Sequence, residues 1–339
     1  MDNTPAFKNG TYACKPVGTV SIQDTQNAIK LIKDTFQTRL SSALNLTRVS
    51  APLFVTDSSG LNDDLANNER AVKFDLKSGE TCAVVQSLAK WKRMALARYK
   101  FTKGTGLYTD MNAIRRDEVI SPLHSYYVDQ WDWELIIDEN ERTMSKLKEV
   151  VRKIYAAIRE TEKEVNSRYN FSNKLPEHIF FISSQDLEDQ YPTLTVKERE
   201  DEITKQHLAV FITGIGQNLR SGKPHDLRAP DYDDWELNGD ILVYSDVINC
   251  AVELSSMGIR VTKTSLLSQL EQSGNLHRLS KDFHTSLMQD KLPFTIGGGI
   301  GQSRLCLFFL EKRHIGEVQV SVWPKMQREE LLKENIFLL

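Results

Sequence analysis

The sequence predicts an α+β fold, a mostly antiparallel β-sheet flanked by helices, and two observations lead to this prediction. Two long segments carry apolar residues at spacings of three and four, which is typical of amphipathic helices. Several shorter runs are rich in β-branched and aromatic residues, and most are followed by a turn or by another such run rather than by a helix. This order favours antiparallel strands with helices packed on the sheet over a doubly wound parallel fold.

The first predicted helix follows Ser21. The segment "SIQD" that begins there has the form of a capping box, in which a side chain accepts a backbone N–H of the first turn. The chain then continues into "TRVSAPLFV", a β-rich segment in which Pro52 favours an edge strand or a bulge, because proline donates no ladder hydrogen bond. The apolar face of this helix is formed by Ile29, Ile32, Phe36, Leu40 and Leu44.

The second predicted helix runs from about Glu141 to Arg168. Strand-like runs surround it: "TCAVVQS", "HSYYVDQWDWE", "HIFFIS", "LAVFITG", "DILVYS", "CAVELSSMGIRV" and "VQVSVW". No repeat, low-complexity tract or linker interrupts the chain, so we expect residues 21–339 to form one domain after an N-terminal extension, residues 1–20. The apolar face of the second helix is formed by Met144, Leu147, Val151, Ile154 and Ile158.

The composition is that of an ordinary soluble globular protein. Of the 339 residues, 40% are hydrophobic and 26% are charged. The net charge of −3 gives no basic field, so we expect no nucleic-acid partner. There is no long apolar run and no signal peptide at the N-terminus, which predicts a cytoplasmic protein without a membrane partner. The four cysteines form no C-x-x-C pair, which argues against zinc and against a disulfide framework.

Polar residues occur in runs that otherwise read as core strands, and such a conflict is typical of a functional site. In "HSYYVDQWDWE" the period of two puts three polar residues on one face and the two tryptophans on the other. The run "CAVELSSMGIRV" carries Glu253, Ser255 and Arg260, and a carboxylate and a guanidinium on a half-buried strand need partners. The polar face comprises Gln130, Asp132 and Glu134, and the other face Asp129, Trp131 and Trp133.

Carboxylates and cations concentrate in three further segments. The segment "APDYDDWELNGDIL" adds four aspartates, of which we expect Asp231 and Asp234 to be solvated loop acids. The remaining two are Asp233 and Asp240. Cations follow the strand run "AVVQS" and recur in "IRRDEV", and this density of both signs suits a small doubly charged substrate and a nucleoside triphosphate. They include Lys90, Lys92 and Arg93, which follow Ser87, and Arg115 and Arg116.

The segment "TIGGGIGQSRL", residues 295–305, holds four glycines in five positions before Arg304. It lacks the Lys-Ser/Thr ending of a P-loop, and its place near the end of the sequence does not suit a dinucleotide fingerprint. Two interpretations remain. The glycines form a tight turn between a strand and a helix, with Arg304 solvated, or they let a flat ligand lie against bare backbone while Arg304 pairs with a phosphate or stacks on a base.

Together these segments resemble motifs 1, 2 and 3 of class II aminoacyl-tRNA synthetases. They are still more similar to the aspartate–ammonia ligases, the ammonia-dependent asparagine synthetases, through "QSLAKWKR", "SPLHS", "YVDQWDWE", "RAPDYDDW", "LNGDILV", "ELSSMGIRV" and "IGGGIGQSRL", which spread over roughly residues 20–325. The sequence departs from the family at three points. The acid that partners Arg115 is Asp117 or Glu118, Gln86 stands where we expect histidine in bacterial relatives, and residues 1–20 match nothing.

The resemblance implies a class II synthetase-like core that makes L-asparagine from L-aspartate, ammonia and ATP. ATP is cleaved to AMP and pyrophosphate through a β-aspartyl-adenylate. The resemblance places Arg115 on the α-phosphate of ATP. It places Arg304, together with Gly299, on the γ-phosphate and adenine side. It assigns Mg²⁺ to Asp240 and Glu253, since this ion prefers oxygen ligands and bridges phosphates.

The resemblance also implies how the amino acid and the ammonia bind. Lys92 and Arg260 would clamp the α-carboxylate, so that the β-carboxylate faces ATP. Near the acyl carbon, Asp63 or Asp64, with Asp63 preferred, would take a proton from ammonium. The remaining substrate contacts would be Asp132 and Asp233 on the α-ammonium, Gln130 on the acyl oxygen, and Ser87 and Ser256 as hydrogen-bond donors.

Three alternatives are weighed against this function. A glutamine-dependent enzyme needs a cysteine after the initiator Met, and residue 2 is Asp2. A tRNA-charging aspartyl or asparaginyl synthetase would need an anticodon module, for which we expect no room before residue 21. A catalytically dead relative would lack Arg115, Glu253 or Arg304, and all three are present. The first helix and the Pro52 segment resemble the element through which class II synthetases dimerise, which predicts a homodimer.

Overall fold

The computed structural model describes residues 21–63 and 70–339. Its large sheet has eight strands in the order β1-β5-β6-β11-β10-β9-β8-β7. The two outermost pairs, β1–β5 and β7–β8, are parallel and the inner pairs are antiparallel, so the predicted α+β architecture is confirmed. The strands are β1 (Leu46–Arg48), β5 (Gly106–Ile114), β6 (Tyr127–Ile136), β7 (Phe180–Ser183), β8 (Ala209–Thr213), β9 (Asp233–Ser245), β10 (Cys250–Arg260) and β11 (Thr295–Gly301).

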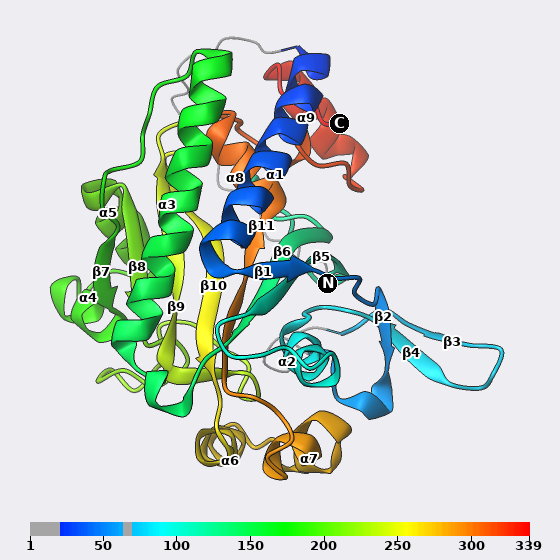
Figure 1. The fold of residues 1–339 in the computed structure, drawn as a ribbon. Helices are drawn as coiled ribbons and strands as arrows, with labels where there is room; N and C mark the ends of the chain where they lie inside the picture. Colours follow the sequence, from blue (N-terminus) through cyan, green and yellow to red (C-terminus); the bar gives the residue numbers. More distant parts are fainter. Residues whose placement is uncertain (1–20, 64–69) are drawn as a thin grey trace, which may run out of the picture.

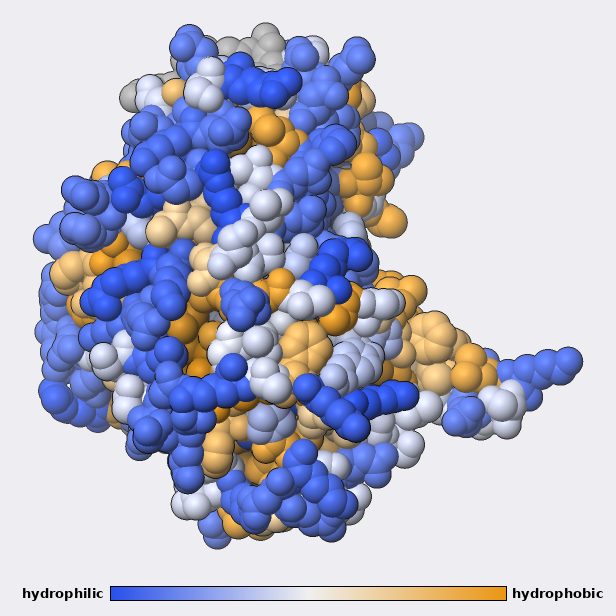
Figure 2. All heavy atoms as spheres, in the orientation of Figure 1, coloured by the Kyte–Doolittle hydropathy of each residue, from blue (hydrophilic) through white to orange (hydrophobic). Residues whose placement is uncertain are grey.

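A second, small sheet has the order β2-β4-β3 and projects from the side of the molecule (Figure 1). In the same orientation, Figure 2 shows apolar atoms at the base of this arm and hydrophilic atoms at its tip. Phe54 and Phe74 are exposed on this sheet, with their ring centroids 5.0 Å apart. Pro52 lies between β1 and β2 and belongs to neither strand. The strands are β2 (Phe54–Thr56), β3 (Lys73–Asp75) and β4 (Thr81–Val84).

Helices cover both faces of the large sheet (Figure 1). Helices α1, α3 and α8 pack on one face, where Phe36 of α1 meets Trp131 of β6 at 4.7 Å between ring centroids. Helices α2, α4 and α5 pack on the other face, where Val210 and Ile212 of β8 point. The helices are α1 (Ile22–Leu44), α2 (Ala89–Arg98), α3 (Met144–Tyr169), α4 (Ser184–Gln190), α5 (Val196–His207), α6 (Lys263–Gln272), α7 (Asp282–Met288), α8 (Gln302–Phe309) and α9 (Lys325–Lys333).

The two predicted long helices are confirmed, and their amphipathic faces form much of the core. The side chain of Ser21 caps α1 by accepting a hydrogen bond from the N–H of Asp24 at 3.1 Å. On α1, Ile32, Phe36 and Leu40 are completely buried. Both helices end at an asparagine in the left-handed conformation, Asn45 and Asn170, which asparagine adopts more readily than most residues.

One of the two interpretations of the glycine segment and one strand prediction are wrong. The glycines of residues 295–301 do not form a turn but are β11, between β6 and β10 in the centre of the sheet. A Cβ at Gly297 would lie 1.9 Å from Oε2 of Glu134, and one at Gly299 would lie 2.3 Å from Oε1 of Gln130. Glycine is therefore required because side chains of β6 occupy the space above β11. The run "VQVSVW" pairs with no strand of the described residues and leaves Val320 and Val322 exposed.

Two expectations concern residues outside those that the structure describes. Residues 1–20 and Asp64 are not among the described residues. Among the helices of residues 21–63 and 70–339, none combines the length and the hydropathy needed to cross a bilayer. That residues 21–339 form one domain stays a prediction.

Candidate active site

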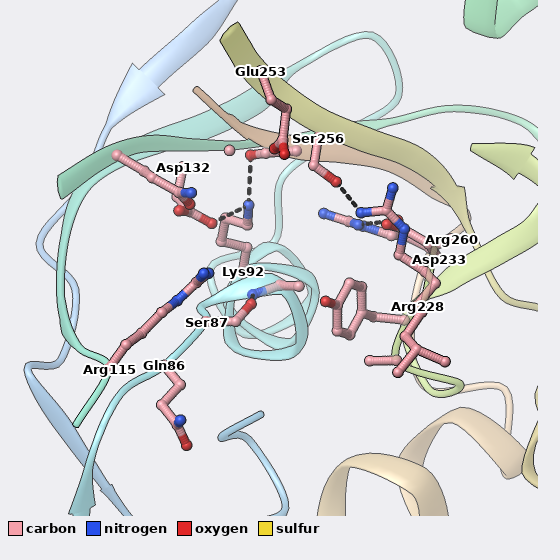
Figure 3. Close-up of a pocket in the computed structure, with 17 residues that line it drawn as sticks. Gln86, Ser87, Lys92, Arg115, Asp132, Arg228, Asp233, Glu253, Ser256 and Arg260 are labelled. Carbon is pink, nitrogen blue, oxygen red and sulfur yellow. Dashed lines mark hydrogen bonds and ion pairs between the residues drawn. The ribbon is translucent and has the colours of Figure 1, made fainter. Parts of the chain in front are cut away.

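A polar pocket lies on the face of the large sheet that also carries α2, and β6, β10 and β11 form its floor (Figure 3). Gln130 and Asp132 of β6 point into it, as the period of two predicts, while Trp131 and Trp133 are buried on the opposite face. Of the predicted site residues, the structure brings together around this pocket Ser87, Lys92, Arg115, Gln130, Asp132, Asp233, Glu253, Ser256, Arg260 and Gly299.

Lys92 enters the pocket from α2 and is almost completely buried. Its Nζ lies 2.5 Å from Oδ1 of Asp132 and donates to the carbonyl oxygen of Gly298 at 2.9 Å. Burial lowers the pKa of Lys92, while the charge of Asp132 opposes this shift. The backbone of β11 thus supplies one of the hydrogen-bond acceptors of the Lys92 ammonium group.

Arg260, at the end of β10, is held by two carboxylates. Its Nε and Nη2 donate to Glu134 at 3.0 and 2.7 Å, and its Nη1 donates to Asp233. Burial alone would lower the pKa of Arg260, but Glu134 and Asp233 raise it well above its usual value. Together with Lys92 and Asp132, these side chains form two adjacent ion-pair groups of two cations and three carboxylates, with a net charge of −1.

A β-bulge in β10 decides which side chains face the pocket. Glu253 pairs with Leu242 and Ser255 with Ile241, so Leu254 is an extra residue in the ladder. The extra residue places Glu253 on the same face as Ser256 and Arg260. Glu253 lines the pocket for this reason, whereas the hydroxyl of Ser255 donates to the carbonyl oxygen of Gly299 at 2.9 Å.

Arg115 and Glu253 line the pocket, whereas Arg304 is not among its lining residues and contacts Glu253. Nη1 of Arg304 donates to the carbonyl oxygen of Glu253 at 3.0 Å and lies 3.6 Å from its Oε2. Nη1 of Arg115 lies 3.8 Å from Oε2 of Glu118, whereas Asp117 is bound by Arg70. Glu118 is therefore the acid that partners Arg115. Within the described residues, the buried Nε of Arg115 has no hydrogen-bond partner.

Asp240 and Glu253 are the two carboxylates predicted to bind Mg²⁺. Burial raises the pKa of Asp240 to about 7; Arg228 opposes this shift and the charge of Glu253 adds to it. Arg228 also donates to Oδ1 of Asp240 at 2.7 Å. No group of three or more His, Cys, Asp or Glu side chains able to hold a metal occurs in the described part of the chain. Two carboxylates still suit Mg²⁺, which usually completes its shell with phosphates and water.

Asp63 lies next to the pocket rather than in its wall. It is buried, and its Oδ2 accepts a hydrogen bond at 3.1 Å from the hydroxyl of Tyr232, which lines the pocket. Asn62 fixes this loop to the end of β4, because its Oδ1 accepts from the N–H of Gln86 at 2.8 Å and its Nδ2 donates to Val84 at 3.0 Å.

Sequence reasoning missed two pocket residues and misjudged two acids. Arg228 and Tyr232 belong to "RAPDYDDW", a segment in which only aspartates were predicted to be functional. Asp231 and Asp234 are not solvated loop acids but are buried. Asp231 accepts hydrogen bonds at 3.0 Å each from Lys90, Arg278 and His284, and Asp234 accepts one from Arg142 at 2.7 Å. The lysine in "AKWKR" could have indicated a buried carboxylate such as Asp231, because a buried Lys90 needs an anionic partner.

We expect Asp231→Asn to lower the free energy of unfolding by about 3–5 kcal/mol, because it leaves buried cations without their counter-charge. Burial would raise the pKa of Asp231, but Lys90, His284 and Arg278 hold it well below its usual value. The stabilisation is therefore present above the unfolded pKa of about 3.9 and is lost as the pH falls toward the folded pKa. Urea unfolding at neutral and acidic pH measures this. Asp246→Asn, at an exposed position, is the control, and an equal effect of both variants would contradict the prediction.

The fold resembles that of asparaginyl-tRNA synthetases. The enzyme from Pyrococcus horikoshii in complex with asparaginyl-adenylate superposes with a TM-score of 0.65 at 15% identity, over 88% of this chain and 70% of that one. The enzyme from Entamoeba histolytica gives a TM-score of 0.64 at 13% identity, over 88% of this chain and 67% of that one. At these identities the likeness concerns the fold alone, and it confirms the class II synthetase-like core.

Sequence comparison is more specific. The family model described as aspartate–ammonia ligase matches residues 23–335. An aspartate–ammonia ligase from Clostridium tetani is 57% identical over 317 residues, covering 93% of this chain and 92% of that protein. Another from Malacoplasma penetrans is 56% identical over 323 residues, covering 94% of this chain and 99% of that protein. The chain belongs to the aspartate–ammonia ligase family.

Proposed function

We propose that this protein makes L-asparagine from L-aspartate, ammonia and ATP, and that it releases AMP and pyrophosphate through a β-aspartyl-adenylate. The observation that carries the proposal is the pair of ion-pair groups in a pocket that Arg115 also lines. Its relatives at 56–57% identity are named aspartate–ammonia ligases, and the synthetases share only 13–15% of their residues with it. A tRNA-charging function is therefore not favoured.

The ion-pair groups support binding of the amino acid by its backbone end. The ammonium of the substrate would lie between Asp132 and Asp233, and its α-carboxylate would face Lys92 and Arg260. Charges of opposite sign then alternate, and the ammonium offsets the net charge of −1. If the β-carboxylate of aspartate bound between these ion-pair groups instead, it would add a negative charge without the adjacent α-ammonium to offset it. The β-carboxylate would then project toward Arg115.

The arginines would act in the adenylation step. Charge develops on the α-phosphate in the transition state, and Arg115 would donate to it. Arg304 would bind the γ-phosphate and the adenine beside the bare backbone of Gly299. Mg²⁺, held by Asp240 and Glu253, would neutralise charge on the phosphates. Gln130 would donate to the acyl oxygen, while Ser87 and Ser256 would hydrogen-bond the substrate at the edge of the site.

The proposal is tested by incubating the purified protein with L-aspartate, ATP, Mg²⁺ and ammonium. We expect equal amounts of asparagine, AMP and pyrophosphate, no product with EDTA in excess, and no asparagine when ammonium is omitted. Adding tRNA in place of ammonium tests the alternative function. Aspartate attached to tRNA, without free asparagine in the ammonium assay, would contradict the proposal.

The orientation of the substrate predicts how its two amides bind. L-Asparagine keeps the free α-carboxylate that Lys92 and Arg260 would contact, whereas isoasparagine carries the amide at that position. We therefore expect asparagine to inhibit competitively against aspartate, and isoasparagine to bind at least about tenfold more weakly, since one charge-assisted hydrogen bond contributes roughly 1.5–3 kcal/mol. Inhibition constants measured side by side decide this, and stronger binding of isoasparagine would reverse the proposed orientation.

We also propose a homodimer formed through α1, β1 and the small sheet. Strand β1 is one of the two edge strands of the described large sheet, and Leu53, Phe54 and Phe74 expose apolar side chains in or next to the small sheet. Exposed apolar side chains at a sheet edge favour association with another chain. Sedimentation equilibrium should give twice 38.7 kDa, and a monomer would refute this. We expect the enzyme to act in the cytoplasm, where ATP is supplied.

A further inference from the structure

Gln86 is a buried amide that lacks partners. Only 1% of the residue is exposed, and in the described structure neither Oε1 nor Nε2 of its side chain makes a hydrogen bond. Gln86 nevertheless lines the pocket. Leaving both ends of an amide without partners in a protein interior is costly, so such a group in a pocket wall points to a ligand.

The surroundings of Gln86 separate it from the ion-pair groups. Figure 3 shows its side chain at the opposite end of the drawn cluster from Glu253 and Ser256, pointing away from Lys92. Its neighbour across the loop is Asp63, because the same Oδ1 of Asn62 accepts from the N–H of Gln86 at 2.8 Å and from that of Asp63 at 3.0 Å. Asn62 therefore holds the backbone of Asp63 beside that of Gln86, so a small ligand bound by Gln86 would lie at the end of the pocket next to the Asp63 loop.

Tyr232 completes this end of the pocket. Burial, and then the charge of Asp63, raise the pKa of the Tyr232 hydroxyl well above its usual value, so it remains a donor to Asp63. This bond orients the Asp63 carboxylate. A phosphate beside Asp63 would be repelled, whereas a small cation would be attracted.

We propose that Gln86 binds the ammonium ion through its side-chain oxygen and holds it beside Asp63. This rests on the proposed function. Ammonium gives one proton to Asp63, and the nitrogen lone pair then forms the C–N bond to the acyl carbon. The C–O bond to the adenylate breaks, AMP leaves with its electron pair, and the nitrogen gives a second proton to water as the amide forms. Gln86 is a substrate-binding residue that contributes no proton.

The test uses Gln86→Met, which keeps the length of the side chain and removes its acceptor. We expect the KM for ammonium to rise about tenfold. Aspartate-dependent exchange of pyrophosphate into ATP, and the KM values for aspartate and ATP, should stay within about twofold of the wild type. The melting temperature should not fall, because the lost amide makes no hydrogen bond in the described structure.

The variant Gln86→Glu distinguishes binding of ammonium by Gln86 from contact of Gln86 with a phosphate. A carboxylate retains the acceptor oxygen, so the KM for ammonium should not rise. If Gln86 instead contacted phosphate, the added charge would reduce pyrophosphate exchange, and Gln86→Met would raise the KM for ATP. Either result would overturn the inference. Gln206→Met, at an exposed position on α5, controls for the substitution itself.

The outcomes also separate this inference from the proposed function. Wild-type protein without aspartate-dependent pyrophosphate exchange would refute the proposed function. Wild-type protein with exchange and asparagine synthesis, but with an unchanged KM for ammonium in Gln86→Met, would refute only the role of Gln86.

Discussion

Replacing Arg115 with alanine is expected to lower kcat/KM for pyrophosphate exchange by about 10²–10³-fold, because a preorganised donor to the charge that develops at phosphorus is removed. Its geometry supports this role. Arg115 follows β5 directly and lines the pocket, Glu118 lies 3.8 Å from its Nη1, and its Nε has no partner in the described structure. A guanidinium that is positioned but incompletely bonded is ready to receive a phosphate.

Two further variants make the Arg115 experiment specific. Arg115→Lys should recover only part of the activity, since an ammonium cannot make the two parallel bonds of a guanidinium. The neighbouring Arg116 is exposed, and Arg116→Ala removes the same charge without touching the pocket, so it should keep nearly full activity. Equal losses in Arg115→Ala and Arg116→Ala would show that only the local positive charge matters, and would contradict the proposed contact.

Much of the fold and part of the site could be predicted from the sequence because local periodicity carries over into the structure. The alternation in β6 correctly placed Gln130 and Asp132 on one face, which lines the pocket, and the two tryptophans on the other face, which is buried. The spacing of three and four on α1 and α3 correctly indicated their buried faces. These features depend only on neighbours along the chain.

Features that depend on neighbours in space could not be predicted. The glycines of β11 look like a turn because the side chains that require them, Glu134 and Gln130, lie on another strand. The bulge at Leu254 is invisible in "CAVELSSMGIRV", yet it determines that Glu253 faces the pocket. Asp231 resembles a loop acid until Lys90, 141 residues away, is brought beside it. In each case the deciding partner is distant in the sequence.

Replacing Asp63 with asparagine is expected to reduce asparagine synthesis by about 10²–10⁴-fold while leaving pyrophosphate exchange nearly unchanged. Ammonium dominates at neutral pH and has no lone pair until it loses a proton, so amide formation needs a base that the adenylation step does not. Asp63 is buried, its Oδ2 accepts from Tyr232, and its loop is fixed to β4 through Asn62. The variant keeps the shape and the acceptor oxygen of the side chain.

The dependence on the nucleophile and on pH distinguishes a base from a structural residue. Hydroxylamine is largely uncharged at neutral pH, so Asp63→Asn should form aspartyl hydroxamate much faster than it forms asparagine. Synthesis with ammonium should recover as the pH approaches that at which ammonium loses its proton in water. Asp57→Asn, at a partly exposed carboxylate earlier in the same loop region, should behave as the wild type. Loss of exchange together with synthesis in Asp63→Asn would mean that this loop serves adenylation, because a group that acts only on the nitrogen cannot affect a step that precedes its arrival.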